Sequence, residues 1–151
     1  MSPFVLLLDS LLLEINKSIN ENIVGINYLE NIKFLLIEKL QALDKLIFND
    51  FIKDISIKKT FNNNRDFKNR KINYTINYLE KSAIKIKSKI EEDSLFIILD
   101  GLKIITIFDK NNHNKSIKTK IFKNKGFVLS QGSIINENNN KKTIILKIIN
   151  K

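Results

Sequence analysis

The chain has 151 residues, of which 43% are hydrophobic and 28% are charged, a composition typical of a folded globular domain. It contains no cysteine and a single histidine, His113. Disulfide bonds, thiolate nucleophiles and a multi-histidine metal site within one chain are therefore excluded, and the lack of cysteine suits a cytoplasmic protein.

The positive charge is concentrated in the C-terminal two thirds of the chain. The formal net charge is +10, yet residues 1–50 carry four Lys and seven Asp or Glu, whereas residues 51–151 carry 22 Lys or Arg and 9 Asp or Glu. A basic region of this kind attracts nucleic acid, anionic lipid or phosphorylated metabolites. The bias toward Ile, Lys and Asn is also what an AT-rich coding sequence gives, so a solvated lysine surface is the alternative.

The first segment is expected to be a buried amphipathic helix. Ser2 and Pro3 are typical of an N-cap followed by proline at the first helical position. Apolar residues then recur at helical spacing, and others widen that face: Phe4, Leu7, Leu8, Leu11, Leu12, Ile15 and Ile19, with Val5, Leu6 and Leu13. Asp9 interrupts the apolar run, which is shorter than the roughly 20 residues of a membrane span, so we expect no transmembrane segment.

A second helix is predicted over residues 28–48, after a turn around Gly25. Its apolar residues step by threes and fours: Leu29, Ile32, Leu36, Leu40, Leu43 and Ile47. Residues 1–50 would therefore form a helical hairpin, which either caps the following domain or pairs two subunits in a homodimer. Residues 51–70 are interpreted as a connecting segment, with a short strand around Ile52, Ile55 and Ile57 and a break at residues 62–66.

Residues 71–151 are predicted to be a β domain, because the apolar period changes to two from Lys71 onward. About seven or eight short strands separated by turn signals indicate a sandwich or small barrel. Asp100-Gly101 lies between the apolar runs 95–99 and 102–108, a strong hairpin signal, and predicts that these runs are the central antiparallel pair of a sheet. The fold class is therefore α+β, with a helical hairpin followed by a small antiparallel β-barrel or sandwich.

Four short segments of this β domain resemble the cupin superfamily, whose barrel is of the jelly-roll type. They are EDSLFIILDG at 92–101, the apolar run 102–108, NKGFVL at 124–129 and TIILKI at 143–148. Within the superfamily the chain is most similar to the sugar-nucleotide 3,4-ketoisomerase group. The resemblance covers about 80 residues of the 151, and it implies a barrel that in relatives holds a metal or a nucleotide-linked sugar.

The residues at the positions of the family's metal ligands are not metal ligands here. Lys87-Ser88-Lys89 stands where the family has a His-x-His pair, Glu92 or Asp93 lies near the family's Glu ligand, and Leu129 stands near its last histidine. A lysine ammonium has no lone pair to give, and one carboxylate cannot hold a metal alone. We therefore predict no metal, no cofactor and no histidine-based catalysis.

The candidate ligand-binding residues are Tyr74, Tyr78, Lys87 and Lys89. If the lysines faced the barrel interior, they would bind the phosphates of a nucleotide-linked sugar. Their alternation with Ile84, Ile86 and Ile90 instead favours isoleucines in the core and lysines in water.

Three functions remain open from the sequence. The first is a cupin-like binding or oligomerisation module without a metal site, which binds a nucleotide-linked sugar if it binds a small ligand. The second is a basic β domain that binds nucleic acid through a set of lysines and two phenylalanines: Lys115, Lys118, Lys120, Lys123 and Lys125, with Phe122 and Phe127. The third is a sugar-nucleotide isomerase-like enzyme that uses Tyr74, Tyr78 or a lysine in place of histidine.

Overall fold

Three helices precede the β domain in the computed structural model, which describes residues 2–67, 70–109, 111–112 and 114–150. They are α1 (Pro3–Ser18), α2 (Gly25–Gln41) and α3 (Lys45–Lys58). The Ser2 hydroxyl accepts a hydrogen bond from the Phe4 backbone N–H at 3.3 Å, as an N-cap does. Within the described part of the chain, no helix is long and apolar enough to span a membrane.

The predicted helix over residues 28–48 and the predicted strand around residues 52–57 were both wrong. The helix breaks after Gln41, and the Asp44 carboxylate starts α3 by accepting a hydrogen bond from the Leu46 N–H at 2.7 Å. Phe51 and Ile55 are the buried residues of α3, four positions apart on one helical face. Helical structure therefore runs to Lys58, further than the predicted boundary at residue 50.

Nine strands follow among the described residues, and they form two antiparallel sheets. The strands are β1 (Thr60–Phe67), β2 (Arg70–Leu79), β3 (Ser82–Lys89), β4 (Ser94–Asp100), β5 (Leu102–Phe108), β6 (Ser116–Phe122), β7 (Gly126–Leu129), β8 (Ile134–Asn139) and β9 (Thr143–Asn150). Their orders are β1-β2-β9-β4-β7 and β3-β8-β5-β6. From β2 to β9 the chain changes sheet at every connection except β5–β6, which is the strand order of a jelly roll. The predicted α+β class with an antiparallel sandwich is confirmed.

The turn at Asp100-Gly101 is not a hairpin, contrary to the prediction. Strand β4 pairs with β7 and β9, whereas β5 pairs with β6 and β8 in the other sheet. The turn therefore carries the chain around a corner of the sandwich. Gly101 has a φ of +90°, and a Cβ atom there would lie 2.3 Å from the Lys142 carbonyl oxygen, so the corner needs glycine both for its conformation and for its space.

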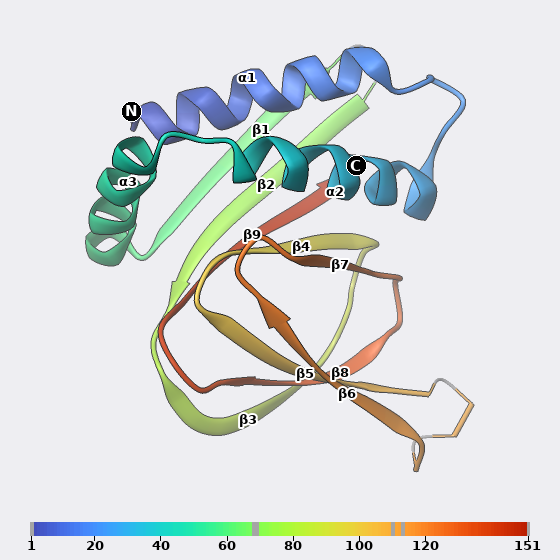
Figure 1. The fold of residues 1–151 in the computed structure, drawn as a ribbon. Coiled ribbons are helices and arrows are strands. Elements are labelled where there is room, and N and C mark those ends of the chain that lie inside the picture. The colour runs from blue at the N-terminus through green and yellow to red at the C-terminus, as the bar shows by residue number, and fades with distance from the viewer. Residues whose placement is uncertain (1, 68–69, 110, 113, 151) are drawn as a thin grey trace.

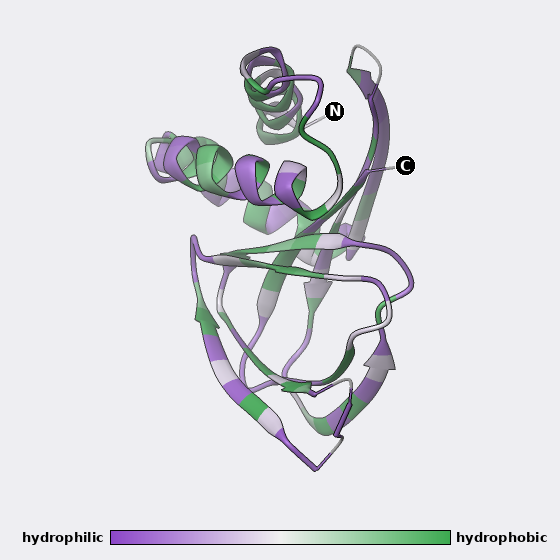
Figure 2. Ribbon diagram, turned by 90° about the vertical axis from the view of Figure 1, so that its right-hand side faces the viewer, coloured by the Kyte–Doolittle hydropathy of each residue, from purple (hydrophilic) through white to green (hydrophobic). Residues whose placement is uncertain are grey.

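The five-stranded sheet has a hydrophobic core on each face (Figures 1 and 2). One core joins the helices to alternate residues of β2, β9 and β4, including Ile76, Leu146 and Ile97. The other lies between the two sheets and is formed by Ile90, Phe96, Ile98, Ile105, Leu129, Ile135 and Ile145. Three layers result: helices, five-stranded sheet and four-stranded sheet. Among the sheet faces, the outer face of the four-stranded sheet is the one that no other described element covers.

Candidate functional site

Lysines line both edges of the outer face of the four-stranded sheet. The register places Lys87 of β3, Asn136 of β8, Thr106 of β5 and Lys118 of β6 in one row across the sheet. In the adjacent row, Asn138 lies opposite Ile104, and Ile104 lies opposite Lys120. Because side chains alternate between faces, residues in these rows point to the same side. We call this surface the lysine face: Lys85, Lys87 and Lys89 on β3, Lys118 and Lys120 on β6, and the floor residues Ile104, Thr106, Asn136 and Asn138.

Lysines from the two edge strands lean over this floor. Lys85 and Lys118 line the same small pocket, of about 20 Å³, together with Glu137 and the floor residues of β5 and β8. The two edge strands are three strand spacings apart, which corresponds to about 14 Å. The Asn138 side-chain oxygen is buried and accepts no hydrogen bond from the described residues. The floor is therefore a shallow surface with an apolar residue, Ile104, and polar residues between two rows of lysines.

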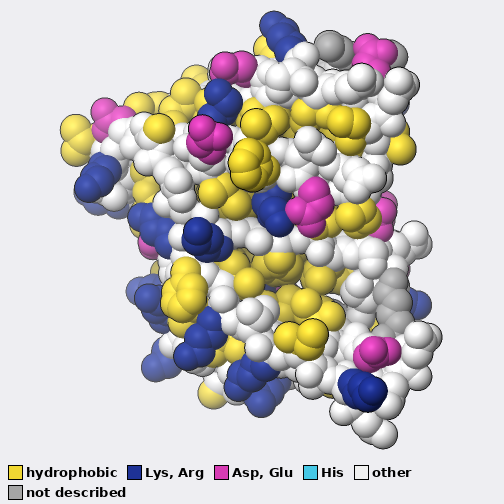
Figure 3. Space-filling view, turned by 45° about the vertical axis from the view of Figure 1, so that its right-hand side comes forward, with side chains coloured by type: hydrophobic (Ala, Val, Ile, Leu, Met, Phe, Trp, Pro, Cys, Tyr) yellow, Lys and Arg dark blue, Asp and Glu magenta, His cyan; other side chains and the backbone are white. Residues whose placement is uncertain are grey.

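The lysine face is strongly electropositive because its cations are uncompensated. All five of its lysines are exposed, and none forms a salt bridge with a residue that the structure describes. The four strands of this sheet carry one acidic residue, Glu137 of β8. Its position in the register is inward-facing, and its carboxylate lies 3.4 Å from the Lys103 ammonium. In Figure 3, basic side chains gather over the sandwich beside exposed hydrophobic ones, while acidic side chains lie more over the helices.

The lysines and phenylalanines proposed from the sequence for nucleic-acid binding do not all share this face. Lys118, Lys120 and Phe122 do. Lys123 instead lies 3.9 Å from the Asp100 carboxylate and over the Phe48 ring, and Phe127 stacks on Phe96 between the sheets. The sequence did not single out Lys85, Lys87 and Lys89 for this role, because they come from a strand far away in the chain. Only the order of strands in the sheet brings β3 and β6 to opposite edges of one surface.

The isoleucines of β3 are less buried than the alternation predicted. Ile86 does share a face with the inward-pointing Glu137, and Lys87 points outward, as expected. However, Ile84 is 72% exposed and Ile86 is 58% exposed, whereas Ile90 is buried. The predicted isoleucine core is therefore wrong for these two residues, which lie on an edge strand and do not belong to the core between the sheets.

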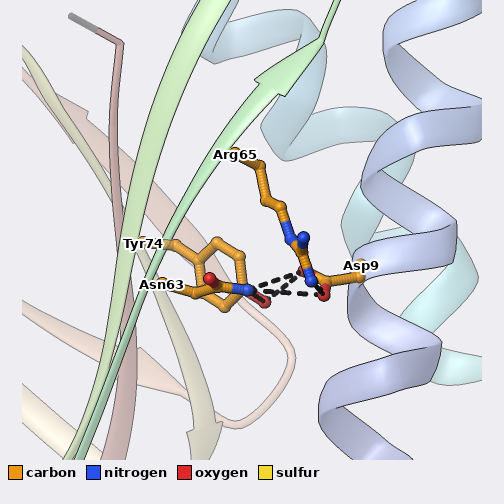
Figure 4. A network of polar contacts seen from close by, with 4 residues as sticks. All are labelled: Asp9, Asn63, Arg65 and Tyr74. Carbon is orange, nitrogen blue, oxygen red and sulfur yellow. Dashed lines mark hydrogen bonds and ion pairs between the residues drawn. The ribbon is translucent and has the colours of Figure 1, made fainter.

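Tyr74 lies in the helix-side core, away from Lys87 and Lys89. Its hydroxyl donates a hydrogen bond to the Asp9 carboxylate of α1 and accepts one from the Asn63 amide at 3.0 Å (Figure 4). Arg65 donates to the same carboxylate at 2.6 Å. Burial, with the hydrogen bond to Asp9, raises the pKa of Tyr74 well above the usual tyrosine value. This network attaches α1 to β1 and β2.

Tyr78 is a partly buried residue on the same side of the sheet, with the Lys59 ammonium 4.3 Å from its ring centroid. Tyr74 and Tyr78 therefore face the helices, whereas Lys87 and Lys89 lie on the outer face of the other sheet. The four candidate ligand-binding residues do not surround one cavity. Their role in binding a nucleotide-linked sugar stays a prediction.

The space between the sheets does not fit the metal centre that the cupin resemblance implies. Leu129 is buried among apolar residues there, Ser88 lies opposite Ile135, and the flanking lysines point outward. Among the described residues, no group of three His, Cys, Asp or Glu side chains could hold a metal ion; His113 lies outside them. The polar groups of this layer are a buried ammonium, Lys103, with Glu137 and with Asn139 at 3.5 Å. A cation beside this ammonium would be repelled by it.

Comparison with known proteins gives matches in structure alone. No protein-family model matches the chain, and no curated protein does. A cupin superfamily protein from Desulfitobacterium hafniense matches with 14% identity and a TM-score of 0.44, covering 60% of this chain and 75% of that one. A conserved protein of unknown function from Streptococcus pyogenes matches with 17% identity and a TM-score of 0.45, covering 61% of this chain and 74% of that one.

A Bacillus subtilis oxalate decarboxylase variant is also similar, with 13% identity and a TM-score of 0.48. This match covers 62% of the chain and 29% of the decarboxylase. Membership of the ketoisomerase group stays a prediction. By its own strand order the chain is a jelly-roll sandwich preceded by three helices, and its neighbours among solved structures include cupin superfamily proteins.

Proposed function

We propose that this jelly-roll module binds nucleic acid through the lysine face. The observation that carries the proposal is the placement of five exposed lysines along both edges of one sheet, with no carboxylate at the described outward positions between them. A polyanion with regularly spaced phosphates would contact both rows at once. The entropy of released counterions then drives binding.

The form of the surface supports an extended ligand rather than a small one. The pocket between Lys85 and Lys118, at about 20 Å³, admits one water molecule or one phosphate oxygen and is too small for a nucleotide. A chain laid across the floor needs no deep cavity, because each phosphate contacts a separate lysine. An anionic lipid surface is the competing partner, and the test below separates the two.

The test is fluorescence anisotropy of a labelled, mixed-sequence single-stranded RNA of about 20 nucleotides, titrated over a range of salt concentrations. The wild-type chain should bind at low salt, with the logarithm of the association constant falling linearly with the logarithm of salt. In a variant with Lys85, Lys118 and Lys120 changed to Gln, the slope should be shallower by about 2, because each phosphate contact contributes about 0.7.

A matched control carries the same change in net charge on the helices. Lys17, Lys45 and Lys53 are exposed lysines of α1 and α3, and their replacement by Gln should leave the slope unchanged. Equal losses in both triple variants would show that binding follows net charge alone and would overturn the proposal. So would an absence of binding at low salt, or binding to vesicles of anionic lipid without binding to RNA.

We further propose that the module acts by binding rather than by catalysis at a metal. The packed apolar layer between the sheets, and the Lys103 ammonium within it, support this proposal. Elemental analysis of the purified chain tests it, and stoichiometric iron, zinc or manganese retained after dialysis against a chelator would contradict it. The expected homodimer remains a separate prediction, for which light scattering is the measurement.

A further inference from the structure

Phe122 is an exposed aromatic side chain at one end of the lysine face. It is the last residue of β6, lies opposite Leu102, and is 57% exposed. Lys120 precedes it by two residues and points to the same side of the sheet. A solvent-exposed aromatic ring beside lysines is available to stack on another planar group.

Phe108 is a second aromatic side chain at the opposite end of the same face. It is the last residue of β5, and the Lys87 ammonium lies 5.4 Å from its ring centroid, which places both on the outer side. Because Phe122 lies opposite Leu102 at the start of β5 and Phe108 ends that strand, the two rings are separated by the length of β5, about 20 Å. The floor between them offers the Thr106 hydroxyl and the amides of Asn136 and Asn138.

The two phenylalanine rings, the hydroxyl and the amides match the chemistry of nucleic-acid bases, whereas the lysines match that of phosphates. A base has a planar face that stacks on a phenylalanine ring, and edges that hydrogen-bond to amides and hydroxyls. In a duplex, base faces are stacked on one another and base edges are paired, so a flat protein surface would reach the phosphates alone.

Resting on the proposed function, we infer that the lysine face is a single-strand site: a strand runs along the floor between Phe122 and Phe108, its bases stack on the two rings, and its phosphates contact the flanking lysines. The distance between the rings corresponds to a few nucleotides, comparable with the smallest site sizes of OB folds, which bind about 4–16 nucleotides each.

The experiment compares an RNA single strand of about 12 nucleotides with the blunt duplex of the same sequence, at one salt concentration. The wild-type chain should bind the single strand more tightly. Phe122→Leu should weaken single-strand binding by about 5-fold to 150-fold, because stacking on an aromatic ring is lost, and should leave duplex binding unchanged. Phe122→Tyr keeps an aromatic face and should restore single-strand affinity. Leu46→Ala, at a 74% exposed residue of α3, is the control for the loss of exposed apolar surface.

A spectroscopic signal separates stacking from a merely structural effect. The fluorescence of 2-aminopurine within the single strand should be quenched by the wild-type chain and by Phe122→Tyr, and much less by Phe122→Leu. If the lysines are needed but duplex and single strand bind equally, and Phe122→Leu changes neither, then the single-strand inference is overturned while the proposed function stands. If neither nucleic acid binds, both are overturned.

Discussion

The hydroxyl of Tyr74 donates a hydrogen bond to the carboxylate of Asp9, and this contact joins the first helix to the second strand across 65 residues of sequence. The same carboxylate accepts from Asn63 and Arg65. Asp9→Ala should lower the free energy of unfolding by about 2–3 kcal/mol, because a hydroxyl and an amide in a partly buried site lose their charged acceptor. Urea denaturation is the measurement. Glu14→Ala, whose partner Lys39 is 33% exposed, should change stability by less than about 0.5 kcal/mol.

The stability of the chain should fall with rising pH in the alkaline range. Burial raises the pKa of Tyr74 far above that of an unfolded tyrosine, and burial also raises the pKa of Tyr28. Above about pH 10 the unfolded chain loses tyrosine protons that the folded chain keeps, so the unfolded state is favoured. The contribution is fully present below about pH 10 and is lost as the pH rises further.

Tyr74→Phe provides the check on this pH dependence. The variant should be less stable than the wild type at neutral pH, since Asp9 loses a donor, and should lose less stability between about pH 8 and about pH 11. The variant should keep the part of the alkaline pH dependence that comes from Tyr28, whose hydroxyl donates a hydrogen bond to Asn16. An identical alkaline slope in wild type and variant would contradict the assignment to Tyr74.

Gly101→Ala should destabilise the chain more than the same change at another glycine with positive φ. A Cβ atom at position 101 would lie 2.3 Å from the Lys142 carbonyl oxygen and 2.9 Å from the Thr143 Cα atom. Gly132 has a similar φ of +88° but has nothing within 4 Å of such an atom. Gly132→Ala should therefore cost about 1–2 kcal/mol for its backbone conformation alone, and Gly101→Ala clearly more. Equal thermal shifts would contradict the described corner.

Removing the charge of Glu137 should destabilise the chain more than removing the charge of Lys103. Lys103 is 2% exposed, and its ammonium lies 3.4 Å from Glu137. Glu137→Gln leaves a buried cation without its counter-charge and should destabilise the chain by about 2 kcal/mol or more. Lys103→Met removes the cation itself and should be neutral within about 1 kcal/mol. Chemical denaturation measures both, and a more damaging Lys103→Met would show that the lysine has a role beyond pairing.

The elements that the sequence predicted well are those whose periodicity belongs to a single buried face. Phe4, Leu8, Leu12 and Ile15 are buried along α1, as their spacing indicated. Leu6 and Leu13, expected to widen that face, are 53% and 44% exposed because α1 packs on one side alone. The jelly-roll order also agrees with the cupin resemblance.

Features that depend on partners far away in the sequence were not predictable in this way. An Asp-Gly pair makes the same tight turn in a hairpin and at a sandwich corner, so residues 100–101 could not reveal which sheet β5 joins. Strand β1 was missed because the segment around Asn62–Asn64 has no apolar alternation, and it is held by β2 and by the contacts of Asn63 and Arg65 with Asp9. Predicting the lysine face would also have required knowledge of which strands are neighbours, since its two lysine rows are about 30 residues apart in the chain.

Strand β9 lies between β2 and β4 in the five-stranded sheet, and its alternate residues belong to both hydrophobic cores. During synthesis it is the last of the described strands to emerge from the ribosome. Until it arrives, β2 and β4 have no common neighbour, and both hydrophobic cores lack the residues that β9 contributes. Neither core is complete before that strand is present, so both reach their final packing only after translation has passed Asn150.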